Sequence, residues 1–182
     1  MFLKSLKGFT LIEIIVVIII LSIVAAITIH FLVDSLRIYK MTVNQKTLFD
    51  EGKLALERMC RDIRDANSIS TPGPGSSGSS ITFIRNNATA QDIAGENITF
   101  QLAGTTLEKV KASPSVTISM ASNVSTFTVT RGATNDEITL FLSLSLASGE
   151  NVTLQTKVYP KNLAKDATYK NFFQNWKEDI SS

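Results

Sequence analysis

Few side chains in this 182-residue sequence could carry out catalytic chemistry. It has one histidine, His30, and one cysteine, Cys60, and His30 lies inside a long apolar stretch. A zinc site needs several such ligands, and nucleophilic catalysis needs a histidine beside a serine or cysteine. The sequence also lacks the glycine-rich phosphate-binding loop that ends in Gly-Lys. We therefore expect a protein that is not an enzyme and has no cofactor, with Cys60 as a small buried core residue.

Two groups of acidic residues in predicted loops could bind calcium: Asp92 with Glu96, and Asp136 with Glu137 and Glu150. The sequence lacks the Asp-x-Asp-x-Asp-Gly pattern of a dedicated calcium loop. We expect solvated turn acids and no metal site, although the sequence alone leaves a catalytic carboxylate pair open.

Glu13 is the residue whose environment is hardest to explain. It lies near the start of an apolar run, residues 11–33, whose other clearly polar members are Ser22, Thr28 and His30. A carboxylate in lipid costs a few kcal/mol and usually has a partner. Glu13 therefore either reaches the lipid headgroups or is neutralised by a neighbouring group.

The apolar run is long enough to cross a membrane. Residues 9–29 would form a helix of about 32 Å, which matches a hydrocarbon core of about 30 Å. The run is too long for a secretory signal peptide and has no Ala-x-Ala cleavage site. We predict a single membrane-spanning helix over residues 9–33.

Charge alone does not decide the orientation of this helix. Lys4 and Lys7 precede it, and Arg37, Lys40 and Lys46 follow it, so the count is nearly balanced. The short N-terminal tail and the Ser/Thr-rich region after the helix favour a cytoplasmic N-terminus. Without residues 1–8, the chain keeps 16 basic and 16 acidic residues, a neutral balance that argues against nucleic-acid binding.

The segment from Lys7 to Glu13 resembles the processing motif of type IV pilins and type II secretion pseudopilins. Its sequence, Lys-Gly-Phe-Thr-Leu-Ile-Glu, follows a basic leader, residues 1–8, and opens the apolar helix. The resemblance implies that a prepilin peptidase cuts between Gly8 and Phe9 and that Phe9 is then N-methylated. It also implies that Glu13 neutralises the new amine of Phe9 on a neighbouring subunit, because opposite charges attract strongly in a low dielectric.

The resemblance further implies the partners and the location of the protein. The partners would be other pilin or pseudopilin subunits through the N-terminal helix, the prepilin peptidase, the assembly platform of the inner membrane, and the membrane itself. The chain would cross the bacterial cytoplasmic membrane once, with a periplasmic or extracellular C-terminal domain, and would then enter a filament.

Residues 34–67 are predicted to continue the helix as an amphipathic segment. No Gly or Pro interrupts residues 9–51, and apolar residues then recur every three or four positions. This face comprises Leu48, Gly52, Leu56, Met59, Ile63 and Ala66, with Phe49 and Cys60 beside it. Arg58, Arg61, Arg64 and Asp65 are expected mostly on the solvated side.

Residues 68–182 are predicted to form a β-sheet domain. A loop rich in Gly, Pro and Ser at residues 71–80 follows the helix, and seven runs of β-forming residues come next. These runs are residues 81–85, 97–102, 106–111, 116–120, 125–130, 137–146 and 152–159. We expect an α+β, pilin-like fold: a mostly antiparallel sheet, the long helix packed on one side of it, and a hairpin formed by the last two runs.

Three later segments resemble the J-type pseudopilins of type II secretion and the W-type minor pilins. They are the helical segment at residues 56–66, the strand at residues 123–127 and the closing segment at residues 158–163. The resemblance implies a minor subunit of the filament.

The last segment of the chain carries a stripe of aromatic residues. Tyr169, Phe172, Phe173 and Trp176 are spaced i, i+3, i+4 and i+7, with Ile180 one turn later. This spacing predicts a short helix that either docks on its own sheet or anchors a neighbouring subunit.

Our leading interpretation is a minor pilin or pseudopilin, a structural subunit of a type IV pilus or a type II secretion pseudopilus, with the filament tip as one location. The alternative is a pilus-tip binding module for adhesion, DNA uptake or recognition of a secreted substrate. A third interpretation is an unrelated single-span membrane protein with a periplasmic β domain.

Overall fold

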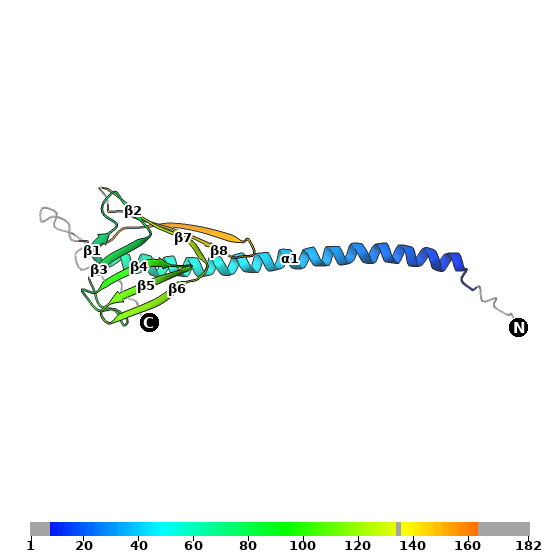
Figure 1. Ribbon diagram of the computed structural model, residues 1–182, viewed down its shortest axis with the longest axis horizontal. Coiled ribbons are helices and arrows are strands. Elements are labelled where there is room, and N and C mark those ends of the chain that lie inside the picture. The colour runs from blue at the N-terminus through cyan, green and yellow to red at the C-terminus, as the bar shows by residue number, and fades with distance from the viewer. Residues whose placement is uncertain (1–7, 134–135, 164–182) are drawn as a thin grey trace. The chain divides into compact units, whose positions relative to one another are not determined.

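A computed structural model describes residues 8–133 and 136–163 of the chain, which divides into two units between Val43 and Asn44. One helix, α1 (Leu11–Arg64), is followed by strands in the second unit (Figure 1). The strands are β1 (Ala66–Thr71), β2 (Ser77–Gly78), β3 (Ser80–Arg85), β4 (Asn97–Ala103), β5 (Thr106–Ala112), β6 (Ser115–Ala121), β7 (Val124–Arg131), β8 (Ile138–Ser145) and β9 (Asn151–Val158). The expected α+β architecture, a long apolar N-terminal helix with antiparallel sheets, is confirmed.

The stretch of α1 up to Val33 is apolar on nearly all its sides, with Glu13 as its one acidic residue. Its most apolar 18-residue window has a mean hydropathy of 3.1, and none of that window is buried within the protein. The hydroxyl groups of Thr28, Ser35 and Thr42 each donate a hydrogen bond to the carbonyl oxygen four residues earlier. Because these polar groups are satisfied inside the helix, they add little to the cost of placing it in lipid.

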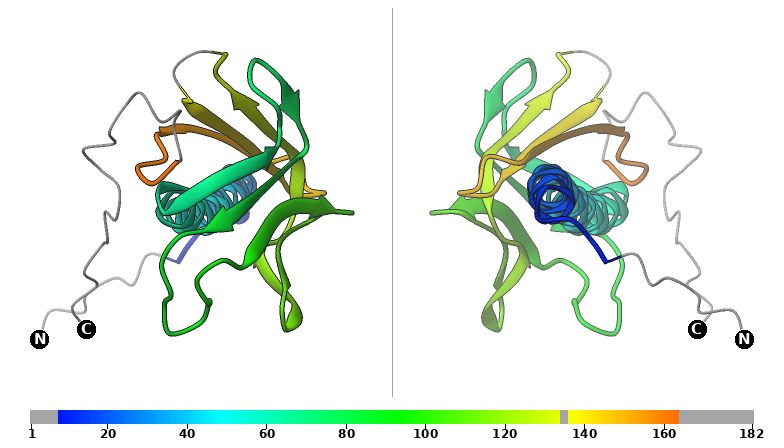
Figure 2. Two further views of the ribbon diagram at one scale, coloured as in Figure 1. Left: turned by 90° about the vertical axis from the view of Figure 1, so that its left-hand side faces the viewer. Right: turned by 90° about the vertical axis from the view of Figure 1, so that its right-hand side faces the viewer.

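The strands form two antiparallel sheets, where the sequence predicted one. The order is β1-β3-β4-β5-β6 in the five-stranded sheet and β2-β7-β8-β9 in the four-stranded sheet. Strand β7 lies against β3, β4 and β5, so the second sheet packs on the first. Figure 2, which looks along the helix, shows the cyan part of α1 between the green strands of one sheet and the yellow and orange strands of the other.

The amphipathic half of α1 supplies one wall of the core. Most of the residues of the predicted apolar face, including Leu48, Met59 and Ile63, are buried against both sheets. Gly52 allows a close approach there, since a Cβ atom on it would lie 2.7 Å from Leu154 Cδ1 and 2.8 Å from Leu144 Cδ1 and would force these leucine ends to shift. Two expectations were wrong: Phe49 is exposed and Asp65 is buried.

The predicted strands agree with the observed ones to within one residue at each end, and the last two form the expected hairpin. The helix was predicted to continue to residue 67, but α1 ends at Arg64. The segment Ala66–Thr71 is extended instead and pairs with β3 as strand β1. Part of the predicted loop at residues 71–80 is strand β2, which pairs with β7. Tyr169, Phe172, Phe173 and Trp176 lie outside the described residues, so the aromatic helix stays a prediction.

Candidate functional site

The residues of the predicted processing site lie at the start of α1. Gly8, Phe9 and Thr10 precede the helix, which begins at Leu11. The Thr10 hydroxyl oxygen lies 3.3 Å from Glu13 N, and the Thr10 carbonyl oxygen lies 3.1 Å from the same nitrogen. Thr10 is therefore the N-cap, with Glu13 three residues later as in a capping box. A carboxylate in this first turn is favoured by the positive end of the helix dipole.

Gly8, Phe9 and Glu13 are all exposed. A Cβ atom on Gly8 would meet no other atom within 4 Å, so packing does not require glycine at this position. Among the residues that the structure describes, the Glu13 carboxylate takes part in no ion pair or side-chain hydrogen bond. The helix dipole favours the charge of Glu13, but within the described chain no packing contact requires Gly8 and no cation pairs with Glu13.

Residues 3–29 match the family model described as a prokaryotic N-terminal methylation motif. The chain carries a prepilin-type methylation motif. This motif supports the type IV pilin and pseudopilin family, and it points to a structural subunit rather than an enzyme. The curated proteins and the solved structures gave no match, so the support for this family comes from the methylation motif over residues 3–29.

The other residues considered for chemistry lie outside the methylation motif and have local partners. His30 Nδ1 lies 3.0 Å from Asp34 Oδ2, on an exposed part of α1. Cys60 is half-buried beside the core, and its burial raises the pKa of the thiol, while a hydrogen bond with Thr156 and the charge of Arg64 oppose that rise. A raised pKa makes Cys60 a poor nucleophile at neutral pH.

The acidic residues just before and after strand β8 each contact a different partner. Asp136 Oδ1 lies 3.1 Å from Arg131 Nη2, and Glu150 accepts a hydrogen bond of 3.0 Å from Asn44 Nδ2. Glu137 pairs with Lys157 at 2.7 Å and accepts a hydrogen bond from Tyr159. Across the described chain, no cluster of three or more His, Cys, Asp or Glu side chains is arranged to hold a metal ion.

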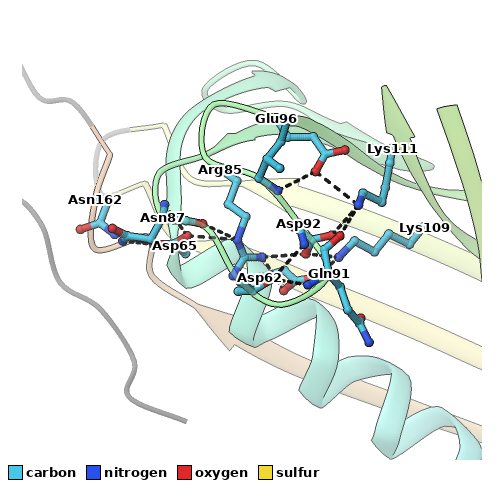
Figure 3. A network of polar contacts seen from close by, with 12 residues as sticks. Asp62, Asp65, Arg85, Asn87, Gln91, Asp92, Glu96, Lys109, Lys111 and Asn162 are labelled. Atoms are coloured by element: carbon cyan, nitrogen blue, oxygen red, sulfur yellow. Dashed lines mark hydrogen bonds and ion pairs between the residues drawn. The ribbon is translucent and has the colours of Figure 1, made fainter. Parts of the chain in front are cut away.

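Asp92 and Glu96 were predicted to be solvated turn acids, and that prediction was wrong. They are 4% and 3% exposed and belong to a buried ionic network, defined as Asp62, Asp65, Arg85, Asp92, Glu96, Lys109 and Lys111 (Figure 3). Asp62 lies in the last turn of α1, and Asp65 is the residue that follows the helix. Arg85 ends β3, the two lysines lie on β5, and Asp92 and Glu96 lie in the loop between β3 and β4.

The contacts of the buried ionic network converge on Asp92 and Asp62. Lys109 Nζ lies 2.6 Å from Asp92 Oδ2 and 2.9 Å from Asp62 Oδ2. Arg85 Nη1 lies 2.8 Å from Asp62 Oδ1 and 3.2 Å from Asp92 Oδ2. Lys111 Nζ adds ion pairs of 3.3 Å to Asp92 and 3.5 Å to Glu96. One helix end, one loop and two strands are joined by these contacts.

Asp65 extends the buried ionic network toward the end of the described chain. It accepts hydrogen bonds from the backbone and side-chain nitrogens of Asn87, at 2.9 and 2.6 Å. Asn162 Nδ2 donates a third bond to it, at 2.9 Å. The segment after β9 is thereby tied to the same helix end as the β3–β4 loop.

Charge in the buried ionic network favours the ionised form of Asp92. Burial by itself would raise the pKa of Asp92, but the hydrogen bonds from Lys109 and Lys111 and the charges of Lys109 and Arg85 outweigh it and hold the pKa below its usual range. The contact of Lys111 with Asp92 is long, at 3.3 Å from Nζ to Oδ1. Arg85, Lys109 and Lys111 all form ion pairs within the network. We therefore interpret it as a structural contact that holds these elements together rather than as a binding site.

Sequence reasoning missed this network, although one signal was present. In the strand at residues 106–111, Leu107, Lys109 and Lys111 alternate onto one face. Because Leu107 is an expected core residue, both lysines also face inward, where they need acidic partners.

Proposed function

We propose that this chain is a structural subunit of a type IV pilus or of a type II secretion pseudopilus, processed by a prepilin peptidase. The observation that carries the proposal is the match of residues 3–29 to the methylation motif. A helix long and apolar enough to cross a membrane follows the motif and supports the same function.

Processing would hydrolyse the peptide bond between Gly8 and Phe9, release residues 1–8 and leave a new amine on Phe9, which is then methylated. The glycine is explained by the peptidase, because packing in the described chain does not demand it. Phe9 is 78% exposed, which is consistent with access by an enzyme.

Assembly would join the Glu13 carboxylate of one subunit to the Phe9 amine of a neighbour. The carboxylate has no partner among the described residues of its own chain. Between packed apolar helices, the attraction between the two charges is far stronger than in water. The apolar side chains of α1, which are exposed in the single chain, would then be covered by lipid before assembly and by other helices after it.

The proposed orientation puts the N-terminus in the cytoplasm and the β-sheet domain on the other side of the membrane. The assembly platform of the inner membrane and neighbouring subunits would contact the protein through its membrane helix. The finer proposal is a minor subunit of the J or W type, supported by the resemblance of residues 56–66, 123–127 and 158–163. Quantitative mass spectrometry of sheared filaments tests it, since a minor subunit must be much scarcer than the main one.

Mass spectrometry of the mature N-terminus tests the processing step. We expect a chain that begins at N-methylated Phe9, and Gly8→Val should leave the leader attached. Lys46→Gln, a change at an exposed residue outside the motif, is the control that should be processed normally. A wild-type chain that keeps Met1 at its working site would refute the proposal.

The role of Glu13 needs a separate experiment. Glu13→Gln keeps the shape of the side chain but removes its charge, so cleavage should continue while incorporation into filaments falls strongly. Glu57→Gln, on an exposed part of the same helix, should assemble normally. Normal incorporation of the Glu13→Gln chain would remove the proposed charge pairing but leave the processing step standing.

A further inference from the structure

Two cations without partners lie just beyond the apolar run of α1. Arg37 and Lys40 are exposed, and because they are three residues apart they project from the same side of the helix. Neither takes part in an ion pair within the described residues. Asp34, the acidic residue nearest to them in sequence, is engaged by His30 at 3.0 Å.

The spacing along the helix places these cations at the depth of lipid headgroups. At 1.5 Å per residue, Arg37 lies about 6 Å and Lys40 about 10 Å beyond Val33, the last residue of the apolar run. Each headgroup layer is about 5–8 Å thick, so the backbone of Arg37 lies within it and the backbone of Lys40 lies just beyond it. Side chains on a helix lean toward its N-terminus, which here is the direction of the membrane. Long basic side chains keep their apolar stems in the membrane and extend their charged ends to its surface, so both charges reach phosphate groups.

Tyr39 lies between Arg37 and Lys40 in the sequence, and its residue type also favours a position at the membrane surface. Its side chain is 70% exposed, and the neighbouring Ile38 and Met41 are also exposed. Tyrosine is enriched where membranes meet water, because its ring is apolar and its hydroxyl is polar. A tyrosine flanked by cations on a helix that is still partly apolar is typical of a membrane-interface anchor.

We propose that Arg37 and Lys40 bind the phosphate groups of anionic phospholipids in the leaflet nearest the β-sheet domain. Without residues 1–8, Arg37 and Lys40, the chain keeps 14 basic and 16 acidic residues, so the remainder carries no net positive charge that would draw anionic lipids to it. Juxtamembrane cations attract anionic lipids over about one Debye length, roughly 10 Å in 0.1 M salt. The contact fixes the depth at which α1 sits before it leaves the membrane.

Native mass spectrometry of the full-length protein in detergent micelles, with equal amounts of phosphatidylglycerol and phosphatidylcholine, tests the proposal. We expect phosphatidylglycerol to be retained in excess, by about fivefold for each cation, and the excess to shrink as salt is raised. The double variant R37Q/K40Q should lose most of this excess, and the part that remains comes from the other flanking cations, Lys4, Lys7 and Lys46. The matched control R58Q/R61Q removes two exposed arginines from the amphipathic half of α1 and should keep the preference.

Equal retention of the two lipids by the wild-type protein, or an undiminished preference in R37Q/K40Q, overturns the proposal. The inference rests on the membrane-spanning role of α1 but not on filament assembly. Reconstitution of the same variants in vesicles separates the two ideas: all should resist extraction by alkaline carbonate. A wild-type chain that is extracted would refute the membrane-spanning role itself.

Discussion

The ammonium nitrogen of Lys109 lies 2.6 Å from Asp92 Oδ2, and both side chains are buried. This pair joins strand β5 to the loop between β3 and β4, and the same nitrogen reaches Asp62 of α1 at 2.9 Å. The filament function proposed above requires the end of a helix to stay attached to its β-sheet domain. The pair contributes to that attachment through charges that are largely shielded from water.

Removing one member of this pair should be far more harmful than removing an exposed charge. Lys109→Met would leave Asp92 and Asp62 buried with too little positive charge, and breaking a buried pair costs about 3–5 kcal/mol. Chemical denaturation of the full-length protein in detergent, followed by circular dichroism, measures this loss of stability.

Lys53→Met is the matched control for Lys109→Met. Lys53 is exposed and lies 3.8 Å from Glu57, so its loss should change the unfolding midpoint little. The double variant Lys109→Met/Asp92→Asn should lose less than the sum of the two single changes, because the charges that it removes interact. Strictly additive losses would show that the two residues do not act as a pair.

The stability of the β-sheet domain should fall in acid partly through Asp92. The pKa of Asp92 is lower in the folded protein than its usual value of about 3.9, so the unfolded chain binds more protons between the two values. Its contribution is complete above the unfolded-state pKa and is lost as the pH falls through the folded-state pKa. The difference in melting temperature between the wild type and Asp92→Asn should therefore be large at pH 7 and shrink below about pH 4. A difference that stays constant from pH 7 to pH 3 contradicts this assignment.

The sequence predicted the secondary structure correctly where the local residue pattern agrees with the burial seen in the structure. Alternation predicted seven strands, and the three-and-four spacing of Leu48, Met59 and Ile63 predicted the buried face of α1. Strand β1 was missed because Ala66 continues the helical spacing, while pairing with β3 makes that segment extended. Strand β2 has only two residues and depends on β7, about fifty positions later in the chain.

The candidate sites also differ in whether they depend on contacts between distant segments of the chain. The methylation motif could be recognised because its residues are contiguous, from Lys7 to Glu13. The buried ionic network could not, because Asp62 and Lys109 meet only after the helix has packed on the five-stranded sheet. From its neighbours in sequence, Asp92 is an acidic residue in a loop and is expected to be solvated. It is buried because cations from other elements pair with it.

Gly52 should tolerate no branched side chain. A Cβ atom there would already lie 2.7 Å from Leu154 Cδ1 and 2.8 Å from Leu144 Cδ1, so Gly52→Val should overpack the core and cost about 1–3 kcal/mol. Gly52→Ala should be milder, because the ends of the two leucines can move. Thermal unfolding of the full-length protein measures both changes. Lys53→Val places the same side chain on the exposed neighbour and should be close to neutral; equal losses at the two positions would mean that packing is not the cause.

Thr10 should control how firmly the helix begins next to the predicted cleavage site. Its hydroxyl accepts the Glu13 N–H at 3.3 Å, and removing an N-cap of this kind costs about 1 kcal/mol. Thr10→Ala should therefore speed amide hydrogen exchange at Glu13 about fivefold in detergent micelles, as measured by NMR, whereas Thr10→Ser keeps the hydroxyl and should exchange like the wild type. Because the cap sits between Phe9 and Glu13, a loosened first turn would also make the position of the Glu13 carboxylate less defined. Unchanged exchange in Thr10→Ala would show that the first turn is held by its surroundings and not by this cap.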